Sequence, residues 1–300
     1  VKSTLAYLKN ECQDVEMATY IYVISRQGLL QGVLSLRDLV FSTDDTLISS
    51  ITNRHVISIP VALDQEEVAQ IFSKYNFVMM PVCDNQNHML GVITMDDVLD
   101  VIQEEASEDI HHMAGLAKEE RIDGTVIESL RSRLPWLIIN LITALLASMV
   151  IDLFQGTISK VVALSAVMTI ISGMGGNAGT QSMTIVVRGL SLGELTRENA
   201  KQILLKELIV GLLSGLVIAL FVSVLALFYE FNIVFGFIAG LAMVLNMIMA
   251  NLSGFLVPVI LERVNIDPAL ASGVFVTTVT DVLGFLFFLG LASLFIQFLI

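Results

Sequence analysis

The sequence predicts a multidomain fold: an α+β tandem of two similar copies, an acidic connecting helix, and an all-α transmembrane domain of five helices. Three observations support this prediction. Of the 300 residues, 55% are hydrophobic and 15% are charged, whereas a soluble domain is about 45–50% apolar and about a quarter charged. The net charge of −13 lies entirely in residues 1–130, and a short motif occurs twice within them. We place the three parts at residues 1–103, 104–130 and 131–300.

Residues 1–103 contain the repeat. Their β-rich runs lie at 20–24, 31–36, 78–83 and 90–94. Gly32-Val-Leu-Ser-Leu-Arg-Asp-Leu-Val40 aligns with Gly91-Val-Ile-Thr-Met-Asp-Asp-Val-Leu99, and each stretch contains a polar residue and an acid typical of a helix start. The two copies resemble a pair of CBS modules. This resemblance implies a regulatory domain that binds an adenine nucleotide such as ATP in the cleft between them.

The connecting helix is predicted by an acidic stretch after the second copy. Between residues 96 and 109 there are seven acids and no Lys or Arg, and we expect a helix or helix pair across 96–128. Four of the acids recur on one helical face; they are Asp97, Asp100, Glu104 and Glu108. Two interpretations remain open, a solvated helix face and a linker that responds to cations.

The acidic charge also limits the partners of the protein. Residues 1–130 contain 8 Lys and Arg against 21 Asp and Glu, and residues 131–300 contain 8 of each. An acidic surface repels nucleic acid and anionic lipid and attracts cations. We therefore expect divalent cations as partners and no nucleic acid.

Residues 131–300 are predicted to cross a lipid bilayer five times. Five apolar segments reach the roughly 20 residues that a span requires; they lie at 135–155, 160–188, 203–229, 234–261 and 269–300. One set of helix ends carries most of the basic residues, namely Arg131, Arg133, Arg188, Arg197, Lys201, Lys206 and Arg263, and the other carries Lys160. The positive-inside rule then predicts that the N-terminal part is cytoplasmic, with Ile300 on the far side. We expect a multi-pass protein of the inner (plasma) membrane.

Two features within the predicted spans favour an ion path. Asp281 lies near mid-membrane, where a carboxylate costs at least about 2.5 kcal/mol and should face a polar cavity or partner. Residues 173–179 contain four glycines, beside Asn177 and Gln181. Such residues favour a pore wall, and tight helix packing is the alternative.

The chemistry of Asp281 favours a hard cation. Mg²⁺ takes oxygen ligands, keeps several waters and is usually bound by one or two carboxylates. Two Asp281 side chains on a two-fold axis could hold one hydrated ion, with oxygens such as those of Asn177 and Thr277 at its water shell. Ligand chemistry alone also allows Ca²⁺ or Mn²⁺. Soft metals are disfavoured because no Cys or His follows residue 130.

Motifs along nearly the whole chain resemble the MgtE family of magnesium channels. They are Asp64-Gln-Glu-Glu-Val-Ala69, Thr94-Met-Asp-Asp-Val-Leu-Asp-Val101, Glu104-Glu-Ala-Ser-Glu-Asp-Ile110, Gly175-Gly-Asn-Ala-Gly-Thr-Gln181, Ile266-Asp-Pro-Ala-Leu270 and Thr280-Asp-Val-Leu-Gly284. The resemblance implies a homodimeric, Mg²⁺-selective channel lined by the second and fifth membrane helices. It makes Asp281 the pore carboxylate and the connecting helix a gating, or plug, helix.

The same resemblance implies regulatory Mg²⁺ ligands; they are Asp64, Glu66, Asp97, Asp100, Glu105, Glu108, Asp109 and Asp267. The family's acidic N-terminal domain is missing from this sequence, so we expect fewer such ligands and weaker inhibition. Asn76 stands where an acid is expected, so we expect the cation site near Glu66 to be weak or lost. In the implied mechanism, cytosolic Mg²⁺ bridges acidic faces that otherwise repel, and the helices shut the pore.

Two other classes of protein are weighed against a channel. An intramembrane metalloprotease needs a His-Glu-x-x-His helix, but the four histidines lie outside the predicted spans, at His55, His88, His111 and His112. We therefore expect no enzyme. A transporter of anions or organic solutes should offer basic residues along its path, whereas the predicted membrane core offers Asp281 and no Lys or Arg.

Overall fold

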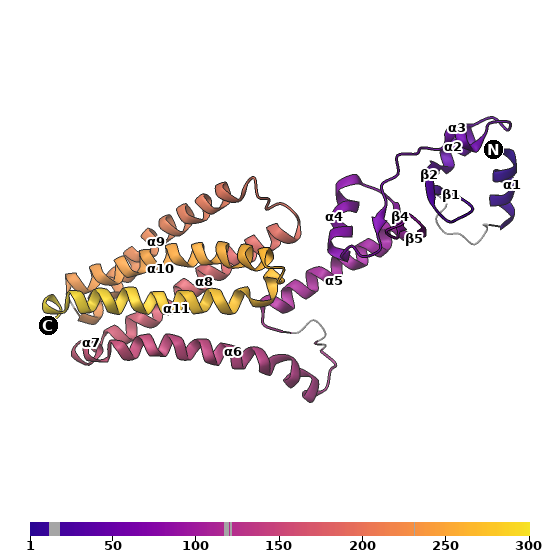
Figure 1. Ribbon diagram of the computed structural model, residues 1–300. Coiled ribbons are helices and arrows are strands. Elements are labelled where there is room, and N and C mark those ends of the chain that lie inside the picture. The colour runs from indigo at the N-terminus through magenta and orange to yellow at the C-terminus, as the bar shows by residue number, and fades with distance from the viewer. Residues whose placement is uncertain (12–18, 117–119, 121, 231) are drawn as a thin grey trace. The chain divides into compact units, whose positions relative to one another are not determined.

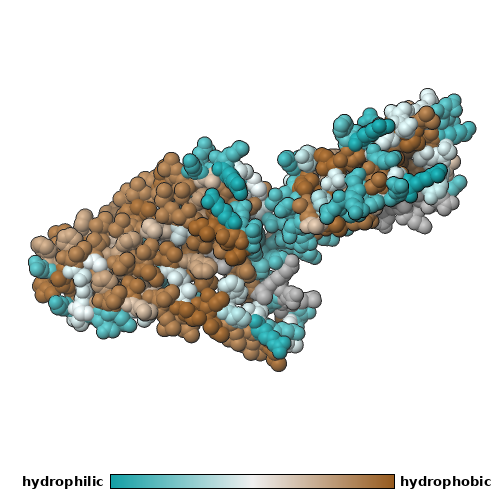
Figure 2. Space-filling view, in the orientation of Figure 1, coloured by the Kyte–Doolittle hydropathy of each residue, from teal (hydrophilic) through white to brown (hydrophobic). Residues whose placement is uncertain are grey.

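The computed structural model describes residues 1–11, 19–116, 120, 122–230 and 232–300 (Figure 1). The chain divides into two compact units, Val1–Ala106 and Ser107–Ile300, which are described separately. The division falls inside a single helix, α5, because that helix begins in the first unit and ends in the second. Figure 2 shows hydrophobic residues over most of the visible face of the second unit and many hydrophilic ones on the first.

The first unit is α+β, in agreement with the prediction. Its described elements are α1 (Lys2–Glu11), β1 (Tyr20–Ile24), β2 (Leu30–Ser35), α2 (Leu36–Phe41), α3 (Ile48–Ile51), β3 (Ile59–Pro60), α4 (Gln65–Tyr75), β4 (Met79–Cys83), β5 (Met89–Thr94) and the start of α5 (Met95–Met113). Strands β1 and β2 form an antiparallel pair. In the second sheet, β4 lies between β3, to which it is parallel, and β5, to which it is antiparallel.

The repeated motif starts a helix in both copies, as the sequence predicts. Ser35 caps α2, and Asp38 returns a bond to it: the Asp38 amide lies 3.1 Å from Ser35 Oγ, and the Ser35 amide lies 3.3 Å from Asp38 Oδ2. In the second copy, the Thr94 amide and hydroxyl both donate to Asp97 Oδ2, at 3.1 and 2.5 Å. A polar residue three positions before an acid satisfies amides that a helix start leaves unpaired.

The hairpin turns of the two copies are joined by main-chain hydrogen bonds. The Leu30 amide donates to the Asn87 carbonyl and the Met89 amide donates to the Gly28 carbonyl, both at 3.0 Å. Gly28 and Asn87 adopt positive φ angles of 84° and 64°, which Gly and Asn tolerate best. The Tyr22 hydroxyl adds a bond of 3.0 Å to the Met79 carbonyl. The two copies therefore form one domain.

The second unit is helical. Beyond the end of α5, its described elements are α6 (Val126–Leu153), α7 (Gln155–Lys160), α8 (Leu164–Ser191), α9 (Ala200–Glu230), α10 (Ile233–Arg263), α11 (Pro268–Leu294) and a 3₁₀ turn, Ile296–Phe298. Helix α10 packs against α8, α9 and α11 and supplies much of the core, including the fully buried Phe235 and Met243. Helix α6 packs mainly on α11 (Figure 1).

Four of the described helices are long and apolar enough to cross a membrane: α6, α9 over Ala200–Phe228, α10, and α11 over Gly273–Leu294. Helix α8 has 28 residues, the same length as α6, but it is not among the four. Its Gly, Ser, Thr, Asn and Gln residues lower its hydropathy. The described part of this unit thus contains the five long helices that the sequence predicts, one of them partly polar.

The connecting helix ends earlier than predicted. We expect a helix or helix pair across 96–128, yet α5 ends at Met113, and Gly115 follows with a φ of 73°. Such a φ is incompatible with a right-handed helix and is typical of a helix end. Residues 117–119 and 121 of the predicted segment lie outside the described residues. Helix α6 then begins at Val126, capped by Thr125, instead of at 135.

Candidate functional site

One face of α8 is polar and exposed, although the helix belongs to the apolar unit. The exposed polar and glycine residues of this face recur every three or four positions, with the exposed Ile185 beside them; they are Thr169, Gly173, Asn177, Thr180, Gln181 and Thr184. We call them the polar face of α8. The opposite face is buried and includes Leu164, Val167 and Ile171. Hydrocarbon cannot satisfy amide and hydroxyl groups, so the polar face requires water or another protein surface.

The predicted pore carboxylate, Asp281, lies in α11, which packs against α8. The two helices approach closely, because a Cβ added at Gly179 of α8 would lie 2.5 Å from Val276 Cγ1 of α11. Asp281 is half-buried, and its Oδ1 accepts a hydrogen bond from the Ser172 hydroxyl of α8. The carboxylate therefore has a partner on the helix that carries the polar face.

The two other predicted pore residues are placed on the same pair of helices. Asn177 is exposed on the polar face of α8. Thr277 lies one turn before Asp281, and its hydroxyl donates to the Gly273 carbonyl at 2.9 Å. A hydroxyl that donates to its own helix still has lone pairs that accept hydrogen bonds from water. Contact of either residue with an ion stays a prediction.

The end of α5 contacts the ends of α8 and α11 within the second unit. Ser191 Oγ of α8 donates to Asp109 Oδ2 at 2.9 Å. His112 Nδ1 lies 2.7 Å from Asp267 Oδ2, while Asp267 Oδ1 caps α11 by accepting from the Ala269 amide at 2.8 Å. Met113 packs into an apolar cluster with residues of α8, α10 and α11. Glu108 is close to the same contacts, because its Oε1 lies 3.8 Å from His112 Nε2. Three predicted regulatory acids, Glu108, Asp109 and Asp267, therefore lie near these helix ends.

The remaining predicted regulatory acids lie in the first unit. Asp64 caps α4 by accepting from the Glu66 amide at 3.0 Å, and Gln65 donates to Glu105 of α5. Hydrogen bonds from Thr94 hold the pKa of Asp97 below its ordinary value, so this side chain stays ionised. Asp100 is exposed on α5.

Asn76, the residue that departs from the expected acid, forms the left-handed end of α4 with a φ of 52°. This conformation suits Asn better than most residues. Asn76 therefore ends α4 in this chain, a structural role that needs no carboxylate.

A pocket of about 280 Å³ lies in the first unit beside the second copy's motif. Its walls are mostly apolar and include Ile59, Val82 and Ile93, while Gln65 and Asp97 supply polar groups. All of its lining residues lie within 59–101, so this pocket is lined by the second copy alone and differs from the expected cleft between the copies. Small-molecule sites commonly combine apolar walls with a few placed polar groups. The pocket is therefore a candidate nucleotide site, and Asp97 is shared between this role and the predicted Mg²⁺ role.

Sequence reasoning missed three polar contacts of the second unit. They are Ser172 with Asp281, His112 with Asp267, and the nearly buried Glu207 of α9, whose Oε2 accepts from Ser182 Oγ at 2.8 Å. Among the described residues, no three His, Cys, Asp or Glu side chains converge as a metal site. The predicted ligands therefore form no preassembled cage within the described part of one chain.

Comparison with known proteins gives two family matches. A model described as a divalent cation transporter matches residues 168–291, and a CBS domain model matches residues 48–104. The chain is 37% identical over 300 residues to the magnesium transporter MgtE of Enterococcus faecalis and 35% identical over 299 residues to that of Thermus thermophilus. These matches cover 100% and 99% of this chain and 66% of each relative, so the chain spans just under two thirds of their length.

A solved structure is also similar to part of the chain. It is the crystal structure of the cytosolic domain of the Mg²⁺ channel MgtE in complex with ATP. The sequences are 41% identical, the match covers 33% of this chain and 40% of that one, and the TM-score is 0.32.

Proposed function

Because the chain belongs to the MgtE family and combines a CBS pair with a helical, multi-pass transmembrane region, we propose that it carries Mg²⁺ across the inner (plasma) membrane into the cytoplasm. The proposed path runs along the polar face of α8 and past Asp281 of α11. The single observation that carries this proposal is the exposure of that face on an otherwise apolar unit. Lipid would leave Asn177 and Gln181 without partners, whereas a hydrated ion path would satisfy them.

We further propose that the path forms between two copies of the chain. A polar face exposed on one chain can be covered by the same face of another across a two-fold axis. Asp281 and its counterpart would then meet one hydrated ion, and two carboxylates suit Mg²⁺. Asn177 and Thr277 would contact the water shell of that ion.

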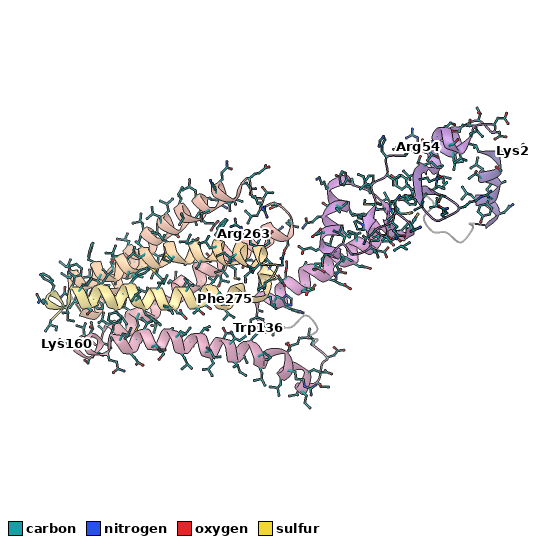
Figure 3. The ribbon with its side chains drawn as sticks, in the orientation of Figure 1. Lys2, Arg54, Trp136, Lys160, Arg263 and Phe275 are labelled. Carbon is teal, nitrogen blue, oxygen red and sulfur yellow. The ribbon has the colours of Figure 1, made fainter. Side chains whose placement is uncertain are left out.

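The distribution of basic residues supports a cytoplasmic position for the first unit. Lys160 ends α7 at one end of the helices, and Arg263 ends α10 at the other (Figure 3). The other basic residues of the predicted spans lie at the same end of the helices as Arg263, as the order of the helices requires; they are Arg131, Arg133, Arg188, Arg197, Lys201 and Lys206. By the positive-inside rule this end faces the cytoplasm.

We propose that cytosolic Mg²⁺ closes the path through the acidic residues. The contacts of Asp109 with Ser191 and of His112 with Asp267 support this role for the end of α5, because they tie it to the helices of the path. Ions bound at Asp64, Glu66, Asp97, Asp100, Glu105, Glu108, Asp109 and Asp267 would relieve repulsion between acids and favour one state. The triple variant Glu105→Gln, Glu108→Gln, Asp109→Asn should need several-fold more cytosolic Mg²⁺ for closure; unchanged inhibition would refute the mechanism.

A regulatory nucleotide is the second part of the proposal. The pocket beside Asp97 has apolar walls for a base, and the ionised carboxylate can accept hydrogen bonds from ribose hydroxyls. We expect calorimetry to detect ATP binding to the full chain and Asp97→Asn to weaken it about tenfold, the effect of losing one charge-assisted hydrogen bond. Equal binding by both proteins would remove Asp97 from the site.

Mg²⁺ flux into proteoliposomes tests the main proposal. A Mg²⁺-sensitive dye inside the vesicles reports uptake by the purified chain, and Asp281→Ala should abolish it. Asp152→Ala serves as a control, because Asp152 lies in the last turn of α6 and its carboxylate bonds to Gln155. Normal Mg²⁺ uptake by Asp281→Ala would remove the carboxylate from the path, and uptake of organic solutes instead of Mg²⁺ would favour a different transporter.

A further inference from the structure

Ser172 of α8 donates its hydroxyl to a carboxylate on another helix, as Ser182 and Ser191 nearer the end of α8 also do. The described hydroxyls of Ser165, Thr169, Thr180 and Thr184 all donate to carbonyls of the chain three or four residues earlier. Ser172 instead donates across to Asp281 Oδ1 on α11. A serine hydroxyl has one hydrogen to donate, so this hydrogen is committed to the carboxylate.

We propose that Ser172 is a positioning residue for the Asp281 carboxylate and that it determines how strongly the path prefers Mg²⁺ to Ca²⁺. The proposal rests on the proposed function, because it assumes that ions pass Asp281. It adds a residue from outside the motifs that resemble the family, and it assigns that residue a role in selectivity.

The turn of α8 that carries Ser172 is held from behind by Asn246 of α10. Asn246 is 0% exposed, and its Nδ2 donates to the carbonyl of Ile171, the residue before Ser172, at 2.8 Å. The amide fits between two glycines, because a Cβ at Gly175 or Gly284 would lie 2.2 or 2.9 Å from Asn246 Nδ2. Gly284 lies one turn after Asp281, so one buried side chain bonds to α8 and packs closely against α11 beside the Ser172–Asp281 bond.

A fixed carboxylate favours the ion with the more rigid shell. With Oδ1 bonded to Ser172, rotation of the Asp281 carboxylate is restricted and Oδ2 has a defined direction. Mg²⁺ demands near-ideal octahedral geometry and gives up its waters reluctantly, whereas Ca²⁺ accepts six to eight ligands in flexible arrangements. Preorganised acceptors therefore favour Mg²⁺, and a mobile carboxylate would adapt to Ca²⁺ as well.

The test compares Mg²⁺ and Ca²⁺ uptake by the full chain in proteoliposomes, measured as the ratio of their initial rates over a range of concentrations. Ser172→Ala removes the bond, and we expect the Mg²⁺ preference to fall about tenfold, as for loss of one hydrogen bond to a charged group. Ser165→Ala is the matched control, because it deletes a serine hydroxyl of the same helix that bonds only to the Val162 carbonyl among its described partners. Its ratio should stay within about twofold of wild type, since exposed helix hydroxyls contribute little.

The outcomes separate the two proposals. A general packing defect in Ser172→Ala would slow both ions equally; an unchanged ratio, with or without slower uptake, would overturn the positioning role and leave the proposed function standing. Ser172→Cys keeps the side chain's size with a weaker donor, so it should give an intermediate ratio and replaces the alanine variant if that one does not insert. If the wild-type chain moves no Mg²⁺, both proposals fail.

Discussion

Helices α8 and α10 are neighbours in one bundle, yet they use their Asn and Gln side chains in opposite ways. On α10, Asn246, Asn251 and Ser253 are buried, and their donors bond to main-chain carbonyls. On α8, Asn177 and Gln181 are exposed. A buried amide in a membrane helix holds its neighbours together, whereas an exposed one has a use only if water or another chain reaches it. Burial of the side chain therefore distinguishes the structural Asn residues of α10 from the exposed Asn and Gln residues of the proposed path on α8.

Exchanging amides for leucine should give opposite results on the two helices. Asn177→Leu should reduce Mg²⁺ uptake at least about tenfold with little change in stability, because the side chain is exposed. Asn246→Leu should destabilise the protein by about 2–3 kcal/mol, because it leaves the Ile171 carbonyl without its side-chain donor and replaces a side chain in a tight site. Proteoliposome flux and thermal unfolding in detergent measure the two effects. Loss of stability in Asn177→Leu would contradict the distinction.

Two glycines of α8 sharpen the same comparison. A Cβ at Gly175, on the buried face, would lie 2.2 Å from Asn246 Nδ2, whereas a Cβ at Gly173, on the polar face, meets nothing within 4 Å. Gly175→Ala should therefore cost about 1–3 kcal/mol through overpacking. Gly173→Ala should be neutral or stabilise the helix by up to about 1 kcal/mol. Detergent unfolding curves of the two variants check the contrast, and equal midpoints would argue against this packing of α8 on α10.

A smaller change in stability is expected at Tyr22, a half-buried residue of the first unit. Its hydroxyl bonds to the Met79 carbonyl, and burial, aided by Tyr20, raises its pKa to about 12 from an ordinary 10.0. Tyr22→Phe should lower the unfolding free energy by about 1 kcal/mol at neutral pH. Because the pKa is raised on folding, this contribution is complete below pH 10 and is lost as the pH rises towards 12. The loss of stability in Tyr22→Phe is measured by amide hydrogen exchange of β1 and β4, compared between the variant and wild type in the full chain.

The titration itself gives a second readout. The tyrosinate absorbance of wild type minus that of Tyr22→Phe should show one ionisation near pH 12. A difference centred at the ordinary value of 10.0 would mean that the hydroxyl is solvated and that Tyr22 does not join the two copies.

Local patterns explain which parts of the fold could be predicted from the sequence. The helix starts at Ser35 and Thr94 depend on a partner three residues away, and the long helices depend on runs of apolar residues. Both signals lie within a few turns of chain. The end of α5 differs from the prediction because acidic residues continue past Gly115 in the sequence, whereas the helix ends at Met113, before the positive φ of Gly115.

The candidate site could be predicted only in part. The cost of a carboxylate at membrane depth singles out Asp281 from the sequence alone, but the positions of the regulatory acids came from the family resemblance. Ser172 and Asp281 are 109 residues apart, and His112 and Asp267 are 155 apart. Contacts at such separations depend on how helices pack, which no short pattern specifies. Ser172 belongs to none of the motifs, and its proposed role follows only from its hydrogen bond to Asp281 of α11.

The seam between the two copies of the first unit consists chiefly of amide-to-carbonyl pairs at Leu30, Asn87, Met89 and Gly28. Backbone groups are common to nearly every amino acid, so most substitutions along this seam keep these main-chain bonds, although the Tyr22 and Asn87 side chains add bonds of their own. During evolution, the side chains of each copy could thus change, to form an acidic surface or a nucleotide pocket, while the main-chain bonds between the two copies were kept. Gly28 and Asn87 are the exceptions, because their turn geometry restricts which residues can replace them.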